Sequence, residues 1–242
     1  MKILGIDEAG KGPVLGPLVL CGYMIDSKDK NKLKKLNVKD SKLLTKKKRE
    51  EIAPELRKIA KYHMLLKVDA KDIDENKKTS NLNKLEIAKM QEIINTLKPD
   101  KVIIDAFEVN TRAFKQKIKA GLKNKKVKLV CENFADKNHV EVSAASVLAK
   151  VCRDDCIHSL REKYGFNGSG YPSDERTIMF LKDWLEKNNE LPDFVRKSWY
   201  TSKTLIAEKE QKTLGVFFDE FCKKWLCIKS KTLQHPKPKG GF

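Results

Sequence analysis

Short apolar runs alternate with amphipathic segments along most of this chain, which is the pattern of a mixed α/β domain. Residues 2–7 and 17–25 are apolar, and the short link between them predicts a hairpin of two strands. Residues 61–68 predict a third strand. The order then becomes helix, strand, helix, strand and helix, over residues 82–97, 102–104, 111–122, 127–131 and 140–163. The whole predicts one α/β layer with mixed strand directions.

The helices are marked by their period and by the residues at their ends. Thr45 is the predicted N-cap of a helix over residues 45–60, which Pro54 strains or divides. A further helix is predicted near 174–188, and the remainder of the chain is helical or irregular. The clearest apolar stripe, in residues 82–97, consists of Leu82, Leu85, Ile87, Ala88, Met90, Ile93, Ile94 and Leu97.

Composition adds a strong basic charge to this picture. The chain has 242 residues, of which 40% are hydrophobic, and a net charge of +18. Half of that charge lies in residues 28–49, with eleven Lys or Arg against two Asp. Such clustering favours a polyanionic partner, although a solvated Lys-rich surface of a heat-adapted protein has the same composition.

The sequence also predicts where the protein works. No apolar run can span a bilayer, and acids interrupt the first apolar stretch too early for a signal peptide. The six cysteines form no Cys-x-x-Cys pair, so free thiols are favoured over a zinc site. We therefore expect a cytoplasmic protein with no membrane association.

The run from Gly5 to Pro13 contains the residues that point most directly to a binding or catalytic site. Asp7 and Glu8 stand at the end of an apolar strand and suit a hard divalent cation, while Gly10-Lys11-Gly12 forms a turn suited to a phosphate or a sugar. The run also matches most of a P-loop, but Gly12 stands where the magnesium-binding Ser or Thr belongs. The two acids would repel a bound phosphate, so a P-loop ATPase or GTPase is disfavoured.

Carboxylates follow three of the predicted strands: Asp7 with Glu8, then Asp105, then Asp136. If these strands are parallel neighbours, the acids converge at one edge of the sheet. Four carboxylates would favour Mg²⁺ or Mn²⁺, and two such ions can cleave a phosphodiester. Each acid alone is better explained as a helix N-cap or loop residue, and Asp7 and Glu8 point to opposite faces unless the strand bends.

Several blocks together resemble the ribonuclease HII family, particularly its archaeal branch. They occur in the family's order over residues 3–185. The blocks are Gly5 to Pro17, Asp40-Ser41-Lys42, Ile104-Asp105, Ala135-Asp136-Lys137, Val142 to Ser146, Ala149 to Asp154 and Gly168 to Asp174.

The resemblance implies a ribonuclease H-like fold, with a five-stranded mixed sheet flanked by helices, and a metal-dependent endonuclease. Its substrates would be RNA–DNA hybrids and single ribonucleotides in duplex DNA, cut on the 5′ side to leave a 3′-hydroxyl and a 5′-phosphate. Asp7, Glu8, Asp105 and Asp136 would be catalytic and hold Mg²⁺ or Mn²⁺, with two ions in each active site. The residues that would contact substrate are Gly10, Lys11, Gly12, Ser41, Lys42 and Tyr171.

Two departures from the family pattern bear on these roles. Relatives often have Arg where Lys11 stands, and Lys keeps the charge without the planar fork. After Lys137 the chain reads Asn138-His139-Val140-Glu141, where relatives tend to have Tyr-Pro and apolar residues. Two interpretations of Lys42 stay open: it contacts the duplex backbone, or it belongs to a solvated face. The alternative for Tyr171 is a loop aromatic packed on the core.

The expected organisation is a catalytic domain over residues 1–188, a small helical C-terminal extension over 189–231 and a disordered tail over 232–242, in a monomer. In the extension, Gln211, Leu214, Phe217 and Phe218 match the peptide that binds replication sliding clamps, although an amphipathic helix end explains them equally. The alternative to the nuclease is a non-catalytic basic RNA-binding protein, which uses the charge and leaves the acids idle.

Overall fold

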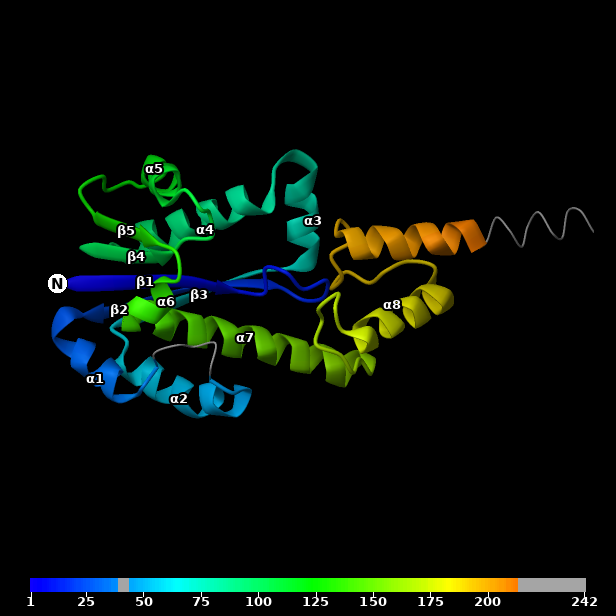
Figure 1. The fold of residues 1–242 in the computed structure, drawn as a ribbon, viewed down its shortest axis with the longest axis horizontal. Coiled ribbons are helices and arrows are strands. Elements are labelled where there is room, and N and C mark those ends of the chain that lie inside the picture. The colour runs from blue at the N-terminus through cyan, green and yellow to red at the C-terminus, as the bar shows by residue number, and fades with distance from the viewer. Residues whose placement is uncertain (39–43, 213–242) are drawn as a thin grey trace, which may run out of the picture.

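A five-stranded mixed sheet forms the centre of the molecule (Figure 1). The computed structural model describes residues 1–38 and 44–212. In spatial order the strands are β3 (Tyr62–Val68), β2 (Leu18–Asp26), β1 (Lys2–Ala9), β4 (Lys101–Asp105) and β5 (Lys128–Glu132). The first three are antiparallel to one another, whereas β1, β4 and β5 are parallel. This arrangement confirms the predicted hairpin and the mixed strand directions.

Helices cover both faces of the sheet (Figure 1). One face carries α1 (Lys30–Lys35), α2 (Lys46–Ile59) and α7 (Val140–Tyr164). The other carries α3 (Ala70–Thr79), α4 (Leu82–Leu97) and α5 (Thr111–Ala120). Because successive strand side chains alternate, Ile3 packs in the core under α7 while Leu4 and Ile6 pack in the core under α4.

A third cluster of buried residues lies at one end of the sheet. It joins α8 (Glu175–Asn188) and a helical segment over residues 200–212 to Leu15 and Ile157. Leu15 forms an isolated antiparallel bridge with Val195, so the chain after α8 returns to the loop that follows β1. The predicted extension therefore contacts the α/β body through residues 194–205; its boundary at residue 188 stays a prediction.

Most predicted elements agree with the structure to within two residues. The helix over 82–97 has the predicted bounds, and Thr45 caps α2 by accepting a hydrogen bond from the Lys48 amide. Pro54 lies inside α2 without dividing it. The pattern did not predict α1, α3, the 3₁₀ turn Ser27–Asp29 or α6 (Ala135–Asn138), which are short and mostly polar.

Two sequence features fall outside the described residues. These are the whole Asp40-Ser41-Lys42 block, with the predicted substrate-contacting residues Ser41 and Lys42, and the part of the clamp-like peptide that holds Leu214, Phe217 and Phe218. Within residues 1–38 and 44–212, no helix is long and apolar enough to cross a membrane. The four cysteines placed in these ranges are free thiols, as expected.

Candidate active site

Three of the four predicted acids form one group. Asp7 lies on β1, Asp105 ends β4, and Asp136 lies in the first turn of α6, which follows β5. One carboxylate oxygen from each lies within 4.8 Å of the others. The parallel register that pairs Ile6 with Ile104 sets Asp7 beside Asp105. The Ala135 amide donates to Asp105 Oδ1 at 2.9 Å, which holds the start of α6 against β4.

Burial makes this group of carboxylates electrostatically costly. Asp7 is 6% exposed and Asp136 is fully buried. Burial raises the pKa of Asp7 to about 7; a hydrogen bond from Ser146 lowers it in part, and the neighbouring Asp105 raises it further. Three hard oxygen donors with no His or Cys among them fit a divalent cation such as Mg²⁺ or Mn²⁺. A bound cation would remove the repulsion that the free carboxylates experience.

The raised pKa of Asp7 predicts how the metal-free protein responds to pH. The folded state keeps a proton on Asp7 up to about pH 7, whereas the unfolded chain releases it near the ordinary value of 3.8. The folded state therefore binds more protons between these values, and the free energy of unfolding falls as pH rises through them. We expect a loss of roughly 2 kcal/mol between about pH 5 and 7.

Chemical denaturation in the presence of a chelator measures this slope directly. Asp7→Asn is expected to make it shallower, because the amide cannot titrate, while Glu8 and Glu86, whose pKa values burial also raises, still contribute. A slope as steep in Asp7→Asn as in the unaltered protein would assign the titration to another group.

Glu8 stands apart from the acid group. β1 continues as a regular strand to Ala9, so the side chains of Asp7 and Glu8 leave opposite faces of the sheet. Glu8 interacts instead with Glu86 of α4 and with Lys11, and burial followed by the charge of Asp7 raises its pKa. Its Oε2 is buried and accepts no hydrogen bond within the described ranges. The metal-ligand role of Glu8 stays a prediction.

Glu86 is a site residue that the sequence analysis missed. Its side chain is fully buried and forms an ion pair with the ammonium of Lys11, which also lies 3.6 Å from the centre of the Phe107 ring. The sequence does contain a signal for this residue. Residue 86 is four residues from both Leu82 and Met90, so its charge interrupts the apolar stripe of α4. A buried carboxylate at such a position requires a cationic partner.

The glycine turn after β1 contains two glycines with different roles. Gly10 has φ +88°, and a Cβ there would lie 2.6 Å from the Pro17 carbonyl oxygen, so the turn requires glycine. Gly12 has ordinary backbone geometry, and a Cβ there would meet only Tyr171 Cε1 at 3.7 Å. The turn leads into β2 and not into a helix, which removes the P-loop alternative.

Tyr171 faces this turn from the loop between α7 and α8. The side chain is 40% exposed, and its ring lies 5.1 Å from the guanidinium carbon of Arg153. Arg153 is buried and donates to the Ser169 carbonyl oxygen at 2.8 Å, while the Val14 amide donates to the Gly170 carbonyl oxygen at 2.8 Å. The structure thus joins the glycine turn and the tyrosine loop, two of the predicted substrate-contacting segments.

Comparisons with known proteins agree with this arrangement. The family model for ribonuclease HII matches residues 4–202. A ribonuclease HII of Methanococcus maripaludis is 43% identical over 213 residues, covering 86% of this chain and 89% of the relative.

Two solved structures are similar as well. The ribonuclease H2 of Pyrococcus horikoshii has a TM-score of 0.82 at 40% identity, covering 86% of this chain and 98% of that one. The ribonuclease HII of Archaeoglobus fulgidus, solved in a complex with PCNA, has a TM-score of 0.76 at 39% identity, covering 82% of this chain and 95% of that one. The predicted ribonuclease H-like fold and the predicted enzyme class are confirmed, and the non-catalytic alternative is set aside: this chain belongs to the archaeal branch of the ribonuclease HII family and is an endoribonuclease.

Proposed function

We propose that this protein hydrolyses the RNA strand of RNA–DNA hybrids and cuts on the 5′ side of single ribonucleotides embedded in duplex DNA. The products would be a 3′-hydroxyl and a 5′-phosphate. The observation that carries the proposal is that a residue of the acid group lies very near the glycine turn along the chain. Asp7, in the acid group, and Gly10, in the turn beside Tyr171, are separated by two residues of one strand end.

Recognition would depend on the surface between the turn and Tyr171. At a single site only the 2′-hydroxyl distinguishes RNA from DNA, and a selective site needs polar groups that approach it closely. The absence of a side chain at Gly12 exposes the backbone, and Tyr171 offers both a ring face and a hydroxyl. The Lys11 ammonium is held by Glu86 and Phe107, so its charge has a defined position beside the turn.

Cleavage would depend on the acid group. Divalent cations bound there would activate a water and stabilise the leaving oxygen, as in other sites where two metal ions act on a phosphodiester. Asp7, Asp105 and Asp136 would hold them, with Glu8 as the fourth proposed ligand. The Ser146 hydrogen bond orients the Asp7 carboxylate, and the Ala135 amide orients that of Asp105.

A 5′-labelled duplex that contains one ribonucleotide tests the proposal. With Mg²⁺ or Mn²⁺, we expect one cut on the 5′ side of the ribonucleotide and no cut in an all-DNA duplex of the same sequence. A full RNA–DNA hybrid should be cleaved in its RNA strand only. Equal cleavage of the all-DNA duplex, or no cut beside the ribonucleotide, would contradict the proposal.

Gly12→Ala provides a sharper version of the same assay. The added methyl group fits the free protein, so we expect the free energy of unfolding to change by less than about 0.5 kcal/mol. It fills the space that the ribose would occupy beside Tyr171, so the KM for the ribonucleotide duplex should rise about tenfold.

Gly10→Ala is the matched comparison for Gly12→Ala. It is expected to destabilise the protein, because its methyl group meets the Pro17 carbonyl and its φ is unfavourable. A Gly12→Ala variant with an unchanged KM would remove Gly12 from the substrate site.

We also infer that residues 211–218 bind a replication sliding clamp. The support is the spacing of Gln211, Leu214, Phe217 and Phe218, together with the PCNA complex of the Archaeoglobus fulgidus relative. Gln211 is exposed near the end of the described helix over 200–212. Replacing both Phe217 and Phe218 by Ala should abolish clamp binding in a pull-down and leave cleavage of a short duplex unchanged.

A further inference from the structure

Arg196 is the largest fully buried side chain among the described residues, and it is directed at the glycine turn. Its guanidinium donates four hydrogen bonds of 2.5–3.2 Å, which reach the carbonyl oxygens of Gly10, Lys11 and Gly16. These acceptors lie about 180 residues earlier in the chain. Because buried carbonyls need donors, Arg196 supplies the hydrogen bonds that a turn of this shape cannot make internally.

The chemistry of these contacts is specific to arginine. The planar guanidinium presents several N–H groups in a fixed fork, whereas a lysine ammonium acts from one point. Burial, followed by repulsion from Arg153, lowers the pKa of Arg196 to about 10, so the side chain remains charged at neutral pH. Arg153 holds the Tyr171 loop through the Ser169 carbonyl oxygen, and Arg196 holds the turn itself through the Lys11 carbonyl oxygen.

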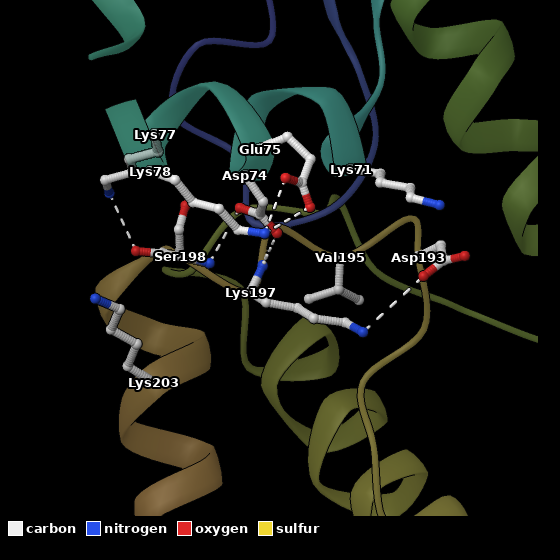
Figure 2. Close-up of a pocket in the computed structure, with 10 residues that line it drawn as sticks. All are labelled: Lys71, Asp74, Glu75, Lys77, Lys78, Asp193, Val195, Lys197, Ser198 and Lys203. Carbon is white, nitrogen blue, oxygen red and sulfur yellow. Dashed lines mark hydrogen bonds and ion pairs between the residues drawn. The ribbon is translucent and has the colours of Figure 1, made fainter. Parts of the chain in front are cut away.

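The segment that carries Arg196 is fixed to the body at several points. The Arg196 amide donates to the Val14 carbonyl oxygen, and the Gly16 amide donates to that of Phe194, both at 2.9 Å. Figure 2 shows a pocket that is lined by α3 and by neighbours of Arg196 in this segment, among them Val195, Lys197 and Ser198. There the Asp74 carboxylate accepts hydrogen bonds from the amides of Lys197 and Ser198 at 2.7 and 3.1 Å, and Lys77 Nζ donates to the Ser198 carbonyl oxygen at 3.1 Å.

We propose that Arg196 is the positioning residue that sets the conformation of the Gly10-Lys11-Gly12 turn for ribonucleotide recognition. Its consequence for substrate recognition rests on the proposed function. Its structural basis is the set of hydrogen bonds that the guanidinium makes. The C-terminal segment, anchored to α3 through Asp74, is then part of the substrate site and not only an appendage. Arg196 acts through the turn and is not itself a catalytic residue.

Amide hydrogen exchange of the full chain tests the structural half without any substrate. In Arg196→Lys, a peptide that covers residues 10–17 should exchange about tenfold faster, while β4 stays as protected as before. Leu205→Ala is the matched control, because Leu205 belongs to the buried cluster that contains Val195, the neighbour of Arg196, whereas the side-chain hydrogen bonds to the Gly10 and Lys11 carbonyls come from Arg196. Unchanged exchange over residues 10–17 in Arg196→Lys, or equal acceleration in Leu205→Ala, would overturn the proposal.

Kinetics on the ribonucleotide duplex test the consequence of the proposal for substrate recognition. Arg196→Lys should raise KM about tenfold with a much smaller change in kcat, because the turn binds substrate while the acid group is intact. A fall in kcat at constant KM would overturn the proposal. If the unaltered protein does not cut this duplex, the proposed function fails while the exchange result still decides whether Arg196 positions the turn.

One measurement keeps the proposal testable even if Arg196→Lys does not fold. In the unaltered protein, amide exchange of the peptides covering residues 10–17 and 194–199, corrected for the intrinsic rate of each sequence, should give the same opening free energy, because the two segments hydrogen-bond each other. Clearly different opening free energies would overturn the proposal.

Discussion

Replacing Asp105 by Asn is expected to reduce kcat on the single-ribonucleotide duplex on the order of a thousandfold, which corresponds to about 4 kcal/mol of transition-state stabilisation. Asn keeps an oxygen that can accept the hydrogen bond from the Ala135 amide, so the local structure has no reason to change. What it removes is one negative charge from the three carboxylates that lie within 4.8 Å of one another. The substitution therefore separates the chemistry from the fold.

Stability and binding are the readouts that make this experiment decisive. In a chelator, Asp105→Asn should be at least as stable as the unaltered protein, because it relieves repulsion with Asp7. Added Mn²⁺ should stabilise the unaltered protein on heating and have a much smaller effect on the variant. Duplex binding should be retained, because the basic surface is unchanged.

Asp183→Asn is the control for net charge, since Asp183 is exposed on α8 and has the same formal charge. It should leave kcat unaltered. If Asp105→Asn lost folding and binding together with cleavage, Asp105 would have a structural role in place of the proposed one.

The second large effect is expected on stability, from Gly5→Ala. Gly5 lies in the middle of β1, directly against the first turn of α7. A Cβ there would stand 2.4 Å from the carbonyl carbon and oxygen of Glu141 and 2.6 Å from the Val142 amide nitrogen. These are backbone atoms in the first turn of a long helix, so the clash cannot be relieved by rotating a side chain. We expect the free energy of unfolding to fall by about 3 kcal/mol or more.

Gly165→Ala is the matched control for Gly5→Ala. It has no heavy atom within 4 Å of the added Cβ but has φ +66°, so only backbone strain contributes and the expected loss is about 1 kcal/mol. Urea denaturation of the two variants beside the unaltered protein measures the difference. Equal losses in both would show that α7 can move away from β1 at little cost.

Hydrophobic periodicity was sufficient to predict an element wherever that element contributes a continuous apolar surface to the core. β1, β2 and α4 were predicted for this reason, and α4 with its observed bounds. α3 and α6 were not predicted, because each has few apolar residues, such as Ile73 in α3, and depends largely on contacts with its neighbours. Pro54 is tolerated inside α2, although local propensity alone predicts strain or a break there.

By itself the sequence determined the elements, their order and the residue types of the chemistry: acids after three strands, a glycine turn and a loop tyrosine. These follow from local pattern, and from the rule that the carboxyl ends of parallel strands meet at one edge of a sheet. Only the tertiary structure decided which acids meet. The regular pleat of β1 separates Glu8 from Asp7, and the parallel pairing of β1 with β4 sets Asp105 beside Asp7.

The tertiary structure also decided the partners of the glycine turn. Glu86 and Arg196 lie 75 and about 185 residues from Lys11, and no local pattern encodes contacts across such separations. A buried charge is stable only where the fold supplies its partner, so the roles of these two residues appear when the chain is packed and not before.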